Sequence, residues 1–518
     1  MNCEKYIMSI DIGTQSVRAL VFSSEGLEIA NERIINDVYY SLEPGWAEVP
    51  ADDIWKNVCY VTNMVADKLG ADIHKVKACS ITANRDNIIP IDKDGNYIRD
   101  WITWVDQRRV PEAVSDAAVS IKGINKVIHT FGKNTFNMLS DRSKFNWFKY
   151  HEKDTYEKAY KYLTIGGLIT YKFTDKYHDS VGMQVGVLPF NIKTLDWFDI
   201  DIMYEIMGIR KDQLPKLFHA GQIMGEITEK ASIESGLPIG IPIVAAGGDK
   251  QCETLGSGAF SEDQATISYG TLATLALTSK KYVGDKNYSY YTWPSAIPNA
   301  WNPEFAIDRG YWLVTWFCRQ YALEEDFPEL LNQMNTKAKD IPAGSHGLFV
   351  YPFWAAHYVL YPDARGAIIG WTDDHRKEHL YRAILESIAY ALRDGFEIIE
   401  KKMKTKVKEI YVVGGGSKSD LAMQLTADIF NIKTIRLQTH EVCAAGAAIV
   451  AGIAVNIFKD EQDGVNKIVK KDKIFYPIQE NRVTYDDIYI NVYKKSYKAN
   501  HAINQTLSKY LAVGEKAY

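Results

Sequence analysis

The sequence predicts an α/β fold built as two similar lobes. Apolar, strand-like runs alternate with stretches of helical periodicity along the 518 residues, and this alternation is typical of α/β proteins. A Gly-Thr turn between two apolar strands also occurs twice, at Gly13-Thr14 and at Gly270-Thr271. Because the two turns lie close to half a chain length apart, we expect a duplicated core.

The first half begins with a predicted β-meander. Residues 4–36 contain three strand-like runs, and Ser24-Glu25-Gly26 marks the second turn. Apolar residues then recur at helical spacing from Ala51 to Leu69, which predicts an amphipathic helix. Further along, the patterns predict strands at 76–82 and 87–91, helices at 140–149 and 154–162, and a buried strand at 239–246.

The second half repeats this alternation and adds a helical tail. Strands are predicted on both sides of Gly270-Thr271 and at 409–413, and helices at 378–403, 419–430, 440–454 and 485–510. We expect an N-terminal lobe at residues 1–253. A C-terminal lobe is expected at 254–480, and a tail at 481–518 that packs back on the core.

Composition and charge exclude several classes of protein. Hydrophobic residues make up 46% and charged residues 24% of the chain, as in ordinary globular proteins. The formal net charge of −5 gives no basic field for nucleic acid or anionic lipid. The six cysteines form no CxxC pair, which indicates a reduced, cytoplasmic protein without structural zinc. The sequence shows neither a membrane span nor a signal peptide.

The first Gly-Thr turn carries a candidate metal site. Backbone N–H groups in such a tight turn form a concave surface that binds anions. Asp11 precedes the turn and Arg18 follows it on the return strand. A carboxylate beside bound phosphates can hold Mg²⁺ directly or through water. Alternatively, Asp11 caps local backbone N–H groups.

Asp249 is the strongest candidate for a catalytic base. It follows the predicted buried strand and Gly247-Gly248, so its carboxylate can reach beyond the edge of a sheet. Phosphoryl transfer to an alcohol needs positioning, charge neutralisation and a carboxylate that accepts the hydroxyl proton. The alternative role is an N-cap for the helix that begins at Lys250, and one residue can serve both roles.

Two further groups of residues suit the two substrates of such a reaction. Gly414-Gly415-Gly416 stands between a predicted strand and helix, where a flat ring or a phosphate can approach the backbone. Charged and aromatic side chains also gather where a polyhydroxylated ligand could use bidentate polar groups and an aromatic wall. They are Arg85, Asp86, Trp104 and Asp106. A surface ion-pair cluster is the alternative for this second group.

Taken together, these motifs resemble the FGGY family of carbohydrate kinases within the actin/hexokinase/Hsp70 ATPase superfamily. The similarity covers nearly the whole chain, and the order and spacing of the motifs are specific. The motifs are Asp11-Ile-Gly-Thr-Gln-Ser-Val-Arg18, Gly45-Trp-Ala-Glu48, Gly247-Gly-Asp249, Ser268-Tyr-Gly-Thr271, the helix Leu380–Arg393 and Gly414-Gly-Gly-Ser-Lys-Ser419.

The resemblance implies two ribonuclease-H-like lobes that close around Mg·ATP and a sugar or polyol in an interlobe cleft. It implies that the lobe at 1–253 binds sugar, phosphate and metal, and that the lobe at 254–480 binds the nucleotide. By this analogy Asp249 is the general base and also lies, with Asp11, near the metal. The acceptor pocket contains Arg85, Asp86, Trp104 and Asp106. ATP contacts Gly13, Thr14, Gln15, Arg18, Gly270, Thr271, Gly415, Gly416 and Ser417. Many relatives form dimers, so the resemblance leaves room for a homodimer.

The substrate and two other functions stay open at this point. Arg85-Asp86 is similar to the Arg-Glu pair of glycerol kinases, whereas Trp104-Val-Asp106-Gln-Arg108 is similar to a segment of xylulokinases. Leu139 and Thr274 stand where glycerol kinases carry aromatic residues. A non-catalytic sugar sensor on the same scaffold is a second hypothesis. A chaperone-like ATPase is a third, but the chain leaves no room for a peptide-binding domain.

Overall fold

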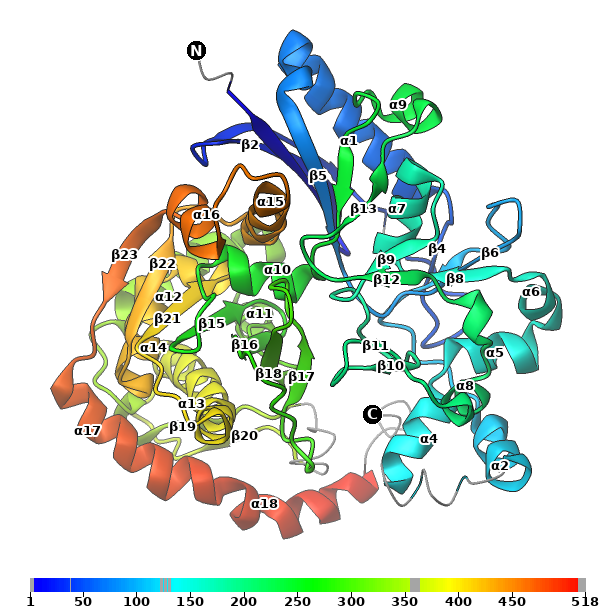
Figure 1. Ribbon diagram of the computed structural model, residues 1–518. Coiled ribbons are helices and arrows are strands. Elements are labelled where there is room, and N and C mark those ends of the chain that lie inside the picture. The colour runs from blue at the N-terminus through cyan, green and yellow to red at the C-terminus, as the bar shows by residue number, and fades with distance from the viewer. Residues whose placement is uncertain are drawn as a thin grey trace. The chain divides into compact units, whose positions relative to one another are not determined.

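The computed structural model describes residues 4–37, 39–121, 124, 128, 132–354 and 364–510. The chain divides into two compact units, whose elements are labelled in Figure 1. Unit 1 consists of Met1–Gly256, Trp293–Ala300 and Glu441–Val469, and unit 2 of Ser257–Thr292, Trp301–His440 and Lys470–Tyr518. The first lobe was expected to end at residue 253, near the break after Gly256. Three features were not foreseen: the grouping of Trp293–Ala300 with unit 1, the return of Glu441–Val469 to unit 1, and the grouping of the tail with unit 2. Residues 511–518 of the tail lie outside the described residues.

Unit 1 is built on a six-stranded sheet that contains the predicted meander. Its strands are β1 (Tyr6–Ile12), β2 (Ser16–Ser23), β3 (Glu28–Ile35), β5 (Val76–Ala83), β13 (Ile223–Glu226) and β14 (Pro242–Val244). Their order is β13-β14-β5-β1-β2-β3. β1 pairs antiparallel with β2 and parallel with β5, and β5 pairs parallel with β14.

The alternation of side chains along β1 divides the packing of unit 1 between two faces. Tyr6, Met8, Ile10 and Ile12 enter a core shared with apolar residues of α1 (Asp53–Leu69) and α7 (Ile165–Thr174). The intervening Ile7 approaches Gly452 of α15 (Val442–Ala454). A segment more than four hundred residues downstream therefore covers the second face of the first strand.

Backbone-to-backbone packing joins α15 to α10 (Asp249–Gly256). A Cβ on Gly256 would lie 1.9 Å from the carbonyl oxygen of Val442, and a Cβ on Gly446 would lie 2.0 Å from that of Cys252. Only glycine fits at these two positions. The helix that begins with Asp249 is thus held directly against the helix that follows Glu441.

The remaining elements of unit 1 are short. Ser143 caps α5 (Lys144–His151) by accepting a hydrogen bond from the N–H of Asn146, so the predicted helix at 140–149 is broken there. The predicted helix at 154–162 ends at Lys158, because Lys161–Leu163 pairs with β6 (Ile89–Ile91) instead. The elements are β4 (Glu48–Val49), β6 (Ile89–Ile91), β7 (Trp101–Ile102), α2 (Pro111–Ser120), α4 (Lys133–Asp141), α5 (Lys144–His151), α6 (Lys153–Lys158), β8 (Lys161–Leu163), β9 (His178–Ser180), β10 (Phe190–Asn191), β11 (Asp196–Trp197), α8 (Asp201–Met207), β12 (Lys216–Phe218), α9 (Glu229–Ser235) and α16 (Glu461–Ile468).

A seven-stranded sheet forms the centre of unit 2. Its strands are β15 (Gln264–Tyr269), β16 (Ala273–Leu277), β17 (Tyr291–Pro294), β18 (Trp301–Ile307), β21 (Glu409–Val413), β22 (Lys433–Leu437) and β23 (Lys471–Phe475). Their order is β17-β18-β16-β15-β21-β22-β23. As in unit 1, the strand before the Gly-Thr turn pairs antiparallel with the strand after it and parallel with a later strand.

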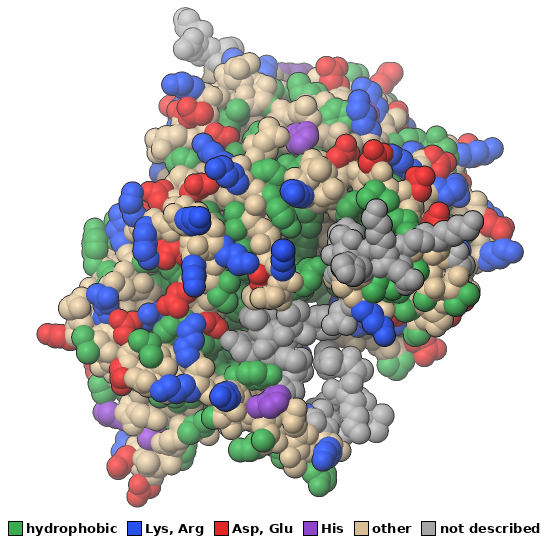
Figure 2. All heavy atoms as spheres, turned by 60° about the horizontal axis from the view of Figure 1, so that its bottom comes forward, with side chains coloured by type: hydrophobic (Ala, Val, Ile, Leu, Met, Phe, Trp, Pro, Cys, Tyr) green, Lys and Arg blue, Asp and Glu red, His purple; other side chains and the backbone are tan. Residues whose placement is uncertain are grey.

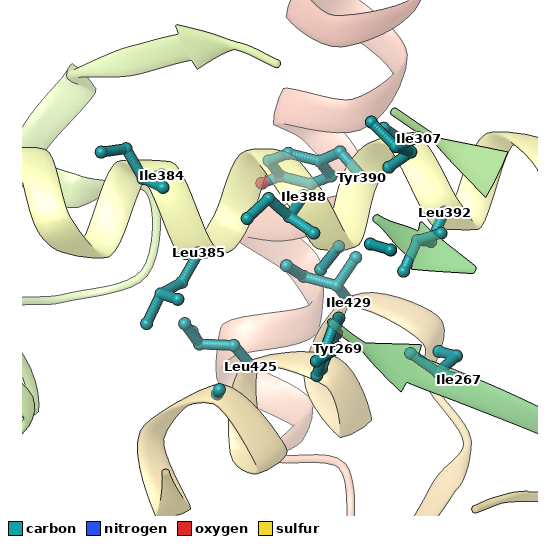
Figure 3. Close-up of a cluster of buried hydrophobic side chains, with 14 of the residues drawn as sticks. Ile267, Tyr269, Ile307, Ile384, Leu385, Ile388, Tyr390, Leu392, Leu425 and Ile429 are labelled. Carbon is teal, nitrogen blue, oxygen red and sulfur yellow. The ribbon is translucent and has the colours of Figure 1, made fainter. Parts of the chain in front are cut away.

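The core of unit 2 lies between this sheet and long helices. Figure 3 shows Ile384 and Ile388 of α13 (Lys377–Met403) with Leu425 of α14 (Asp420–Phe430) and Ile267 and Tyr269 of β15. All are buried. Also in this unit are α11 (Trp312–Tyr321), α12 (Phe327–Ala338), β19 (Phe349–Tyr351), β20 (Ala367–Ile369), α17 (Gln479–Ile488) and α18 (Lys494–Leu507).

Polar contacts anchor the described part of the tail to α13. Arg382 donates to the hydroxyl of Tyr485 at 2.8 Å, and that hydroxyl donates to Glu386 at 2.9 Å. All three side chains are buried. In Figure 1, α17 and α18 form a nearly continuous run of helix along unit 2, interrupted by a π-helical turn at Tyr489–Tyr493.

The surface carries mixed charges. Figure 2 shows basic and acidic side chains interspersed over the face that it draws. Among the described residues, no helix combines the length and the apolar character needed to cross a membrane.

Candidate active site

Three loops of unit 1 meet at one edge of its sheet. β1, β5 and β14 run parallel and are neighbours, so their carboxyl ends share an edge. The loops that leave these ends carry Gly13-Thr14, Arg85-Asp86 and Gly248-Asp249. Ligands of open α/β sheets bind outside the carboxyl ends of strands. The topology therefore gathers three predicted motifs at the edge where such a site is expected.

The first Gly-Thr turn is held by side chains from outside the hairpin. The N–H of Gly13 donates to the carbonyl of Ser16 at 2.9 Å. Asn36 donates to the carbonyls of Gly13 and Thr14 at 3.0 and 3.3 Å, and Trp104 donates from its indole to the Thr14 hydroxyl at 3.0 Å. Thr14 and Gln15 are both exposed, so the tip of the turn is open to a ligand.

Asp11 and Arg18 face each other across the hairpin and meet a third charged residue. Arg18 Nη1 lies 3.4 Å from the Asp11 carboxylate and 2.8 Å from that of Glu441. Burial raises the pKa of Asp11 to about 7; Arg18 opposes this shift, and the carboxylates of Asp249, Glu441 and Glu253 add to it. A buried carboxyl among other carboxylates is a position where a cation would be stabilising.

These side chains fit a magnesium ion that is shared with a nucleotide. Mg²⁺ usually binds one or two carboxylates and keeps its other positions for water and phosphate oxygens. Asp11 and Asp249 supply that number of carboxylates. Within the part of the chain that the structure describes, no three His, Cys, Asp or Glu side chains are grouped to hold a metal by themselves.

Asp249 lies at the start of a helix and keeps an accessible carboxylate. It is the first residue of α10, and its Oδ1 accepts a hydrogen bond from the N–H of Lys250 at 2.8 Å. The same oxygen lies 3.2 Å from Nε of Arg85. With 29% of its side chain exposed, Asp249 is accessible to a substrate hydroxyl.

Asp86 and Trp104 lie in the neighbouring loops. Asp86 adopts a left-handed backbone conformation with φ of 58°, and its carboxylate pairs with Lys144 at 3.1 Å. A Cβ on Gly186 would come within 2.3 Å of Asp86 Oδ1, so that glycine leaves space for the carboxylate. Trp104 is 40% exposed. Both side chains can therefore reach a bound ligand.

Asp106 has different surroundings from the other predicted substrate residues. Its carboxylate receives hydrogen bonds from the Arg108 guanidinium at 2.8 Å and from the N–H of Ala47 at 2.7 Å. Only 1% of the side chain is exposed. Arg108 also pairs with Glu48 at 2.7 Å. In this structure Asp106 faces a buried ion-pair network rather than an open pocket.

A cavity of about 400 Å³ opens beside the first Gly-Thr turn. Thr14, Gln15 and Trp104 line it, together with Asn36, Asn57, Asn84 and Asn87. Arg85, Asp86 and Asp249 do not line it. Of the predicted sugar-binding residues, Trp104 lines this cavity and Arg85 pairs with Asp249, whereas Asp86 and Asp106 do neither.

Unit 2 brings its predicted nucleotide residues to a corresponding edge. β15 and β21 are parallel neighbours, so Gly270-Thr271 and the Gly414–Ser417 loop leave the sheet side by side. The N–H of Tyr311 donates to the carbonyl of Gly270 at 3.0 Å, and the Tyr311 ring packs on Tyr269. A Cβ on Gly416 would lie 2.2 Å from the Tyr311 ring.

The members of the glycine loop differ in what surrounds them. A Cβ on Gly415 would meet no atom within 4 Å, whereas Gly416 is packed. Ser417 is buried, and its hydroxyl donates to the carbonyl of Gly414 at 2.8 Å. Gly415 is thus the open position of the loop.

Glu441 and Lys144 belong to the site but were not predicted. Glu441 directly precedes α15, and a single charge before a helix rich in alanine and glycine was the only signal in the sequence. Lys144 lies in the first turn of α5, where a basic residue is unremarkable. Both reach the site through long-range contacts that sequence periodicity does not encode.

Comparison with known proteins gives the family. A model of the N-terminal domain of the FGGY family of carbohydrate kinases matches residues 6–256, and the model of the C-terminal domain matches residues 265–455. A xylulose kinase of Bacillus subtilis is 25% identical over 513 residues, covering 96% of this chain and 99% of that protein. A glycerol kinase of Alkaliphilus metalliredigens is 29% identical over 492 residues, covering 92% of this chain and 95% of that protein.

A solved structure confirms the predicted fold. The gluconate kinase of Lactobacillus acidophilus superposes with a TM-score of 0.82 at 22% identity, covering 98% of this chain and 100% of that one. The resemblance inferred from the twin turns, Gly247-Gly-Asp249 and the glycine loop is confirmed by the family models, which together span most of the chain. The chain belongs to the FGGY family of carbohydrate kinases.

Proposed function

We propose that this chain transfers the γ-phosphoryl group of ATP to a hydroxyl of a small sugar or polyol, with Asp249 as the general base. The observation that carries the assignment of the base is the position of Asp249. It stands at the carboxyl edge of the unit 1 sheet, partly exposed and beside Arg85. A carboxylate in this setting can accept the proton of an attacking hydroxyl.

The remaining predicted residues are assigned roles on the same basis. Backbone groups of the two Gly-Thr turns and Arg18 are proposed to contact the phosphates, and Gly415, Gly416 and Ser417 to line the adenosine site. Mg²⁺, when bound, neutralises phosphate charge, and Asp11 and Asp249 are the side chains that would hold it. Among the predicted sugar-binding residues, Arg85, Asp86 and Trp104 are proposed to contact the acceptor. Asp106 is proposed to support the loop that carries Trp104, through its ion pair with Arg108.

The identity of the acceptor is open among the substrates for which the similar proteins are named: xylulose, glycerol and gluconate. The experiment is to measure ADP release with glycerol, erythritol, ketopentoses, ketohexoses and aldonates. We expect one chemical class to stimulate ADP release far above the rate without acceptor. If no acceptor stimulates release while one raises the melting temperature, the chain is a sugar-binding protein and the proposal fails.

A further inference from the structure

The buried carboxamide of Gln251 has no hydrogen-bond partner within the described chain. Gln251 lies in α10, two residues after Asp249, and its exposed fraction is 1%. Neither Nε2 nor Oε1 makes a hydrogen bond with any group that the structure describes. Leaving a buried donor and acceptor unpaired is costly, and such groups are rare in folded proteins. A group that binds in this place would remove that cost.

The geometry places this carboxamide beside the proposed base. A Cβ on Gly248 would lie 2.8 Å from Gln251 Oε1 and 2.8 Å from both Cγ and Cδ of Arg85. Gly248 directly precedes Asp249, and its φ is not positive. Glycine is therefore required here for space rather than for conformation, because any larger residue would displace Arg85 or the carboxamide.

Arg85 lies next to both the proposed base and the carboxamide. In this structure its Nε pairs with Asp249 at 3.2 Å, while its methylene groups lie over Gly248 and near Gln251. A substrate hydroxyl that binds to Oδ1 of Asp249 would take the place of this ion pair. Displacement of Arg85 from Asp249 would also move the side chain that packs over Gly248 beside the carboxamide.

We propose that Gln251 is a specificity-determining residue that binds the substrate hydroxyl next to the one that is phosphorylated. A hydroxyl both donates and accepts hydrogen bonds, and a carboxamide offers one group of each kind. This assignment rests on the proposed function, since it takes Asp249 as the base. It predicts an acceptor with two neighbouring hydroxyls, one facing Asp249 and the other facing Gln251.

The first test uses the wild-type protein and needs no variant. It compares kcat/KM for the best acceptor of the ADP-release panel with that for the analogue lacking the hydroxyl next to the phosphorylated one. A site that is built to bind a hydroxyl rejects the deoxy analogue strongly, because its own polar groups stay unpaired. We expect a loss of roughly 100-fold or more. Equal kcat/KM values would overturn the proposal while leaving the kinase function intact.

The second test is Gln251→Met, which keeps the size of the side chain and removes its polar atoms. We expect the KM for the acceptor to rise roughly ten-fold or more, and the acceptor-induced rise in melting temperature to shrink. For the deoxy analogue, kcat/KM should be similar in wild type and in the variant. Without ligand, the variant should be as stable as wild type or more stable, because the unpaired groups are gone. Gln333→Met, on the exposed face of α12, is the matched control and should change none of these values.

An ordered water that pairs with the carboxamide is the competing explanation. In that case Gln251→Met lowers the stability of the ligand-free protein and leaves the KM for the acceptor unchanged, which would overturn the proposal. If Gln251→Met does not fold, equal kcat/KM values for the acceptor and its deoxy analogue in wild type would still overturn the proposal. If wild type phosphorylates no acceptor at all, it is the proposed function that fails.

Discussion

Gly415 and Gly416 are neighbours, yet the structure gives them different surroundings. A Cβ on Gly416 would collide with the Tyr311 ring at 2.2 Å, and a Cβ on Gly415 would enter open space. We expect Gly416→Ala to destabilise the protein by about 1–3 kcal/mol, the usual cost of overpacking. Gly415→Ala should change stability by less than about 0.5 kcal/mol but weaken ATP binding, because its methyl group occupies ligand space. Urea denaturation and calorimetric titration with ATP measure both effects, and equal stability losses for the two variants would contradict the distinction.

Glu441 orients Arg18 by a 2.8 Å ion pair. We expect Glu441→Gln to lower kcat/KM for ATP several-fold, because Arg18 loses the charge that holds it, and to leave the KM for the acceptor unchanged. Steady-state kinetics with each substrate varied in turn measure the difference. Glu480→Gln, an exposed residue of α17, is the control. Equal rises in both KM values would indicate general damage instead of an effect on nucleotide.

At the residue scale, the sequence motifs picked out residues that the structure brings to one edge of the unit 1 sheet, but not the residues that hold them there. Arg85 and Asp249 were predicted because each follows a strand, and Asp11 because it precedes the first Gly-Thr turn; strand patterns and glycine turns are both visible in the sequence. Glu441 and Lys144 were missed because their places depend on contacts between distant segments. Asp106 was grouped with the substrate residues, but its carboxylate is enclosed by Arg108 and Ala47.

At the scale of elements, β9 supports the loop that carries Asp249. Ser180 donates from its hydroxyl to the carbonyl of Ala246, and Gly182 bridges to Gly247. Within β9, burial raises the pKa of Asp179 to about 6 from its ordinary 3.8, although hydrogen bonds from Thr164 and the N–H of Ser180 oppose the shift. The folded protein therefore binds this proton more tightly than the unfolded chain does.

The sign of the pH dependence follows from this raised pKa. The contribution of Asp179 to stability is fully present below pH 4 and is lost as the pH rises through 6. We expect the free energy of unfolding of wild type, relative to Asp179→Asn, to fall by roughly 1 kcal/mol between pH 5 and pH 7.5. Urea denaturation of both proteins at the two pH values measures it. A difference that does not change with pH would show that the carboxyl titrates normally.

Elements were predicted best where one periodicity extends over a long segment. The helix at 378–403 and the strand at 409–413 match α13 (Lys377–Met403) and β21 (Glu409–Val413) closely. The strand expected at 239–246 is only Pro242–Val244, because its pairing with β5 is limited to Ile243 and Val244. The helix expected at 154–162 loses its end to β8, where pairing with β6 outweighs local helical preference.

At the scale of the whole molecule, unit 1 is discontinuous. α15 covers the face of β1 opposite the α1 and α7 core, and Ser80 of β5 donates to the carbonyl of Ala447 at 2.7 Å. We expect residues 1–256 expressed alone to lack a cooperative unfolding transition and to bind a hydrophobic dye, because that face is uncovered. Adding residues 441–469 through a flexible linker should restore cooperative unfolding. Cooperative unfolding of 1–256 alone would contradict the assignment of α15 to the core of unit 1.

The duplicated architecture was predictable, but the return of Glu441–Val469 to unit 1 was not. Two Gly-Thr turns half a chain apart indicate two similar sheets, and each turn does join two antiparallel strands. Nothing in the local pattern of residues 440–454 beyond a helix rich in alanine and glycine shows that it returns to unit 1. That return depends on the fit of Gly446 against Cys252 and of Gly452 against Ile7.

The central claim is that Asp249 accepts the proton of the attacking hydroxyl, and Asp249→Asn tests it most directly. Asparagine keeps the shape of the side chain and can still accept the hydrogen bond from the N–H of Lys250. It cannot take up the proton of the hydroxyl. With the best acceptor, we expect the rate of ADP release to fall by roughly 100-fold or more, while ATP still binds in calorimetric titration. Asp67→Asn, an exposed position of α1, should retain the wild-type rate. An Asp249→Asn variant that keeps most of its turnover would show that another group is the base.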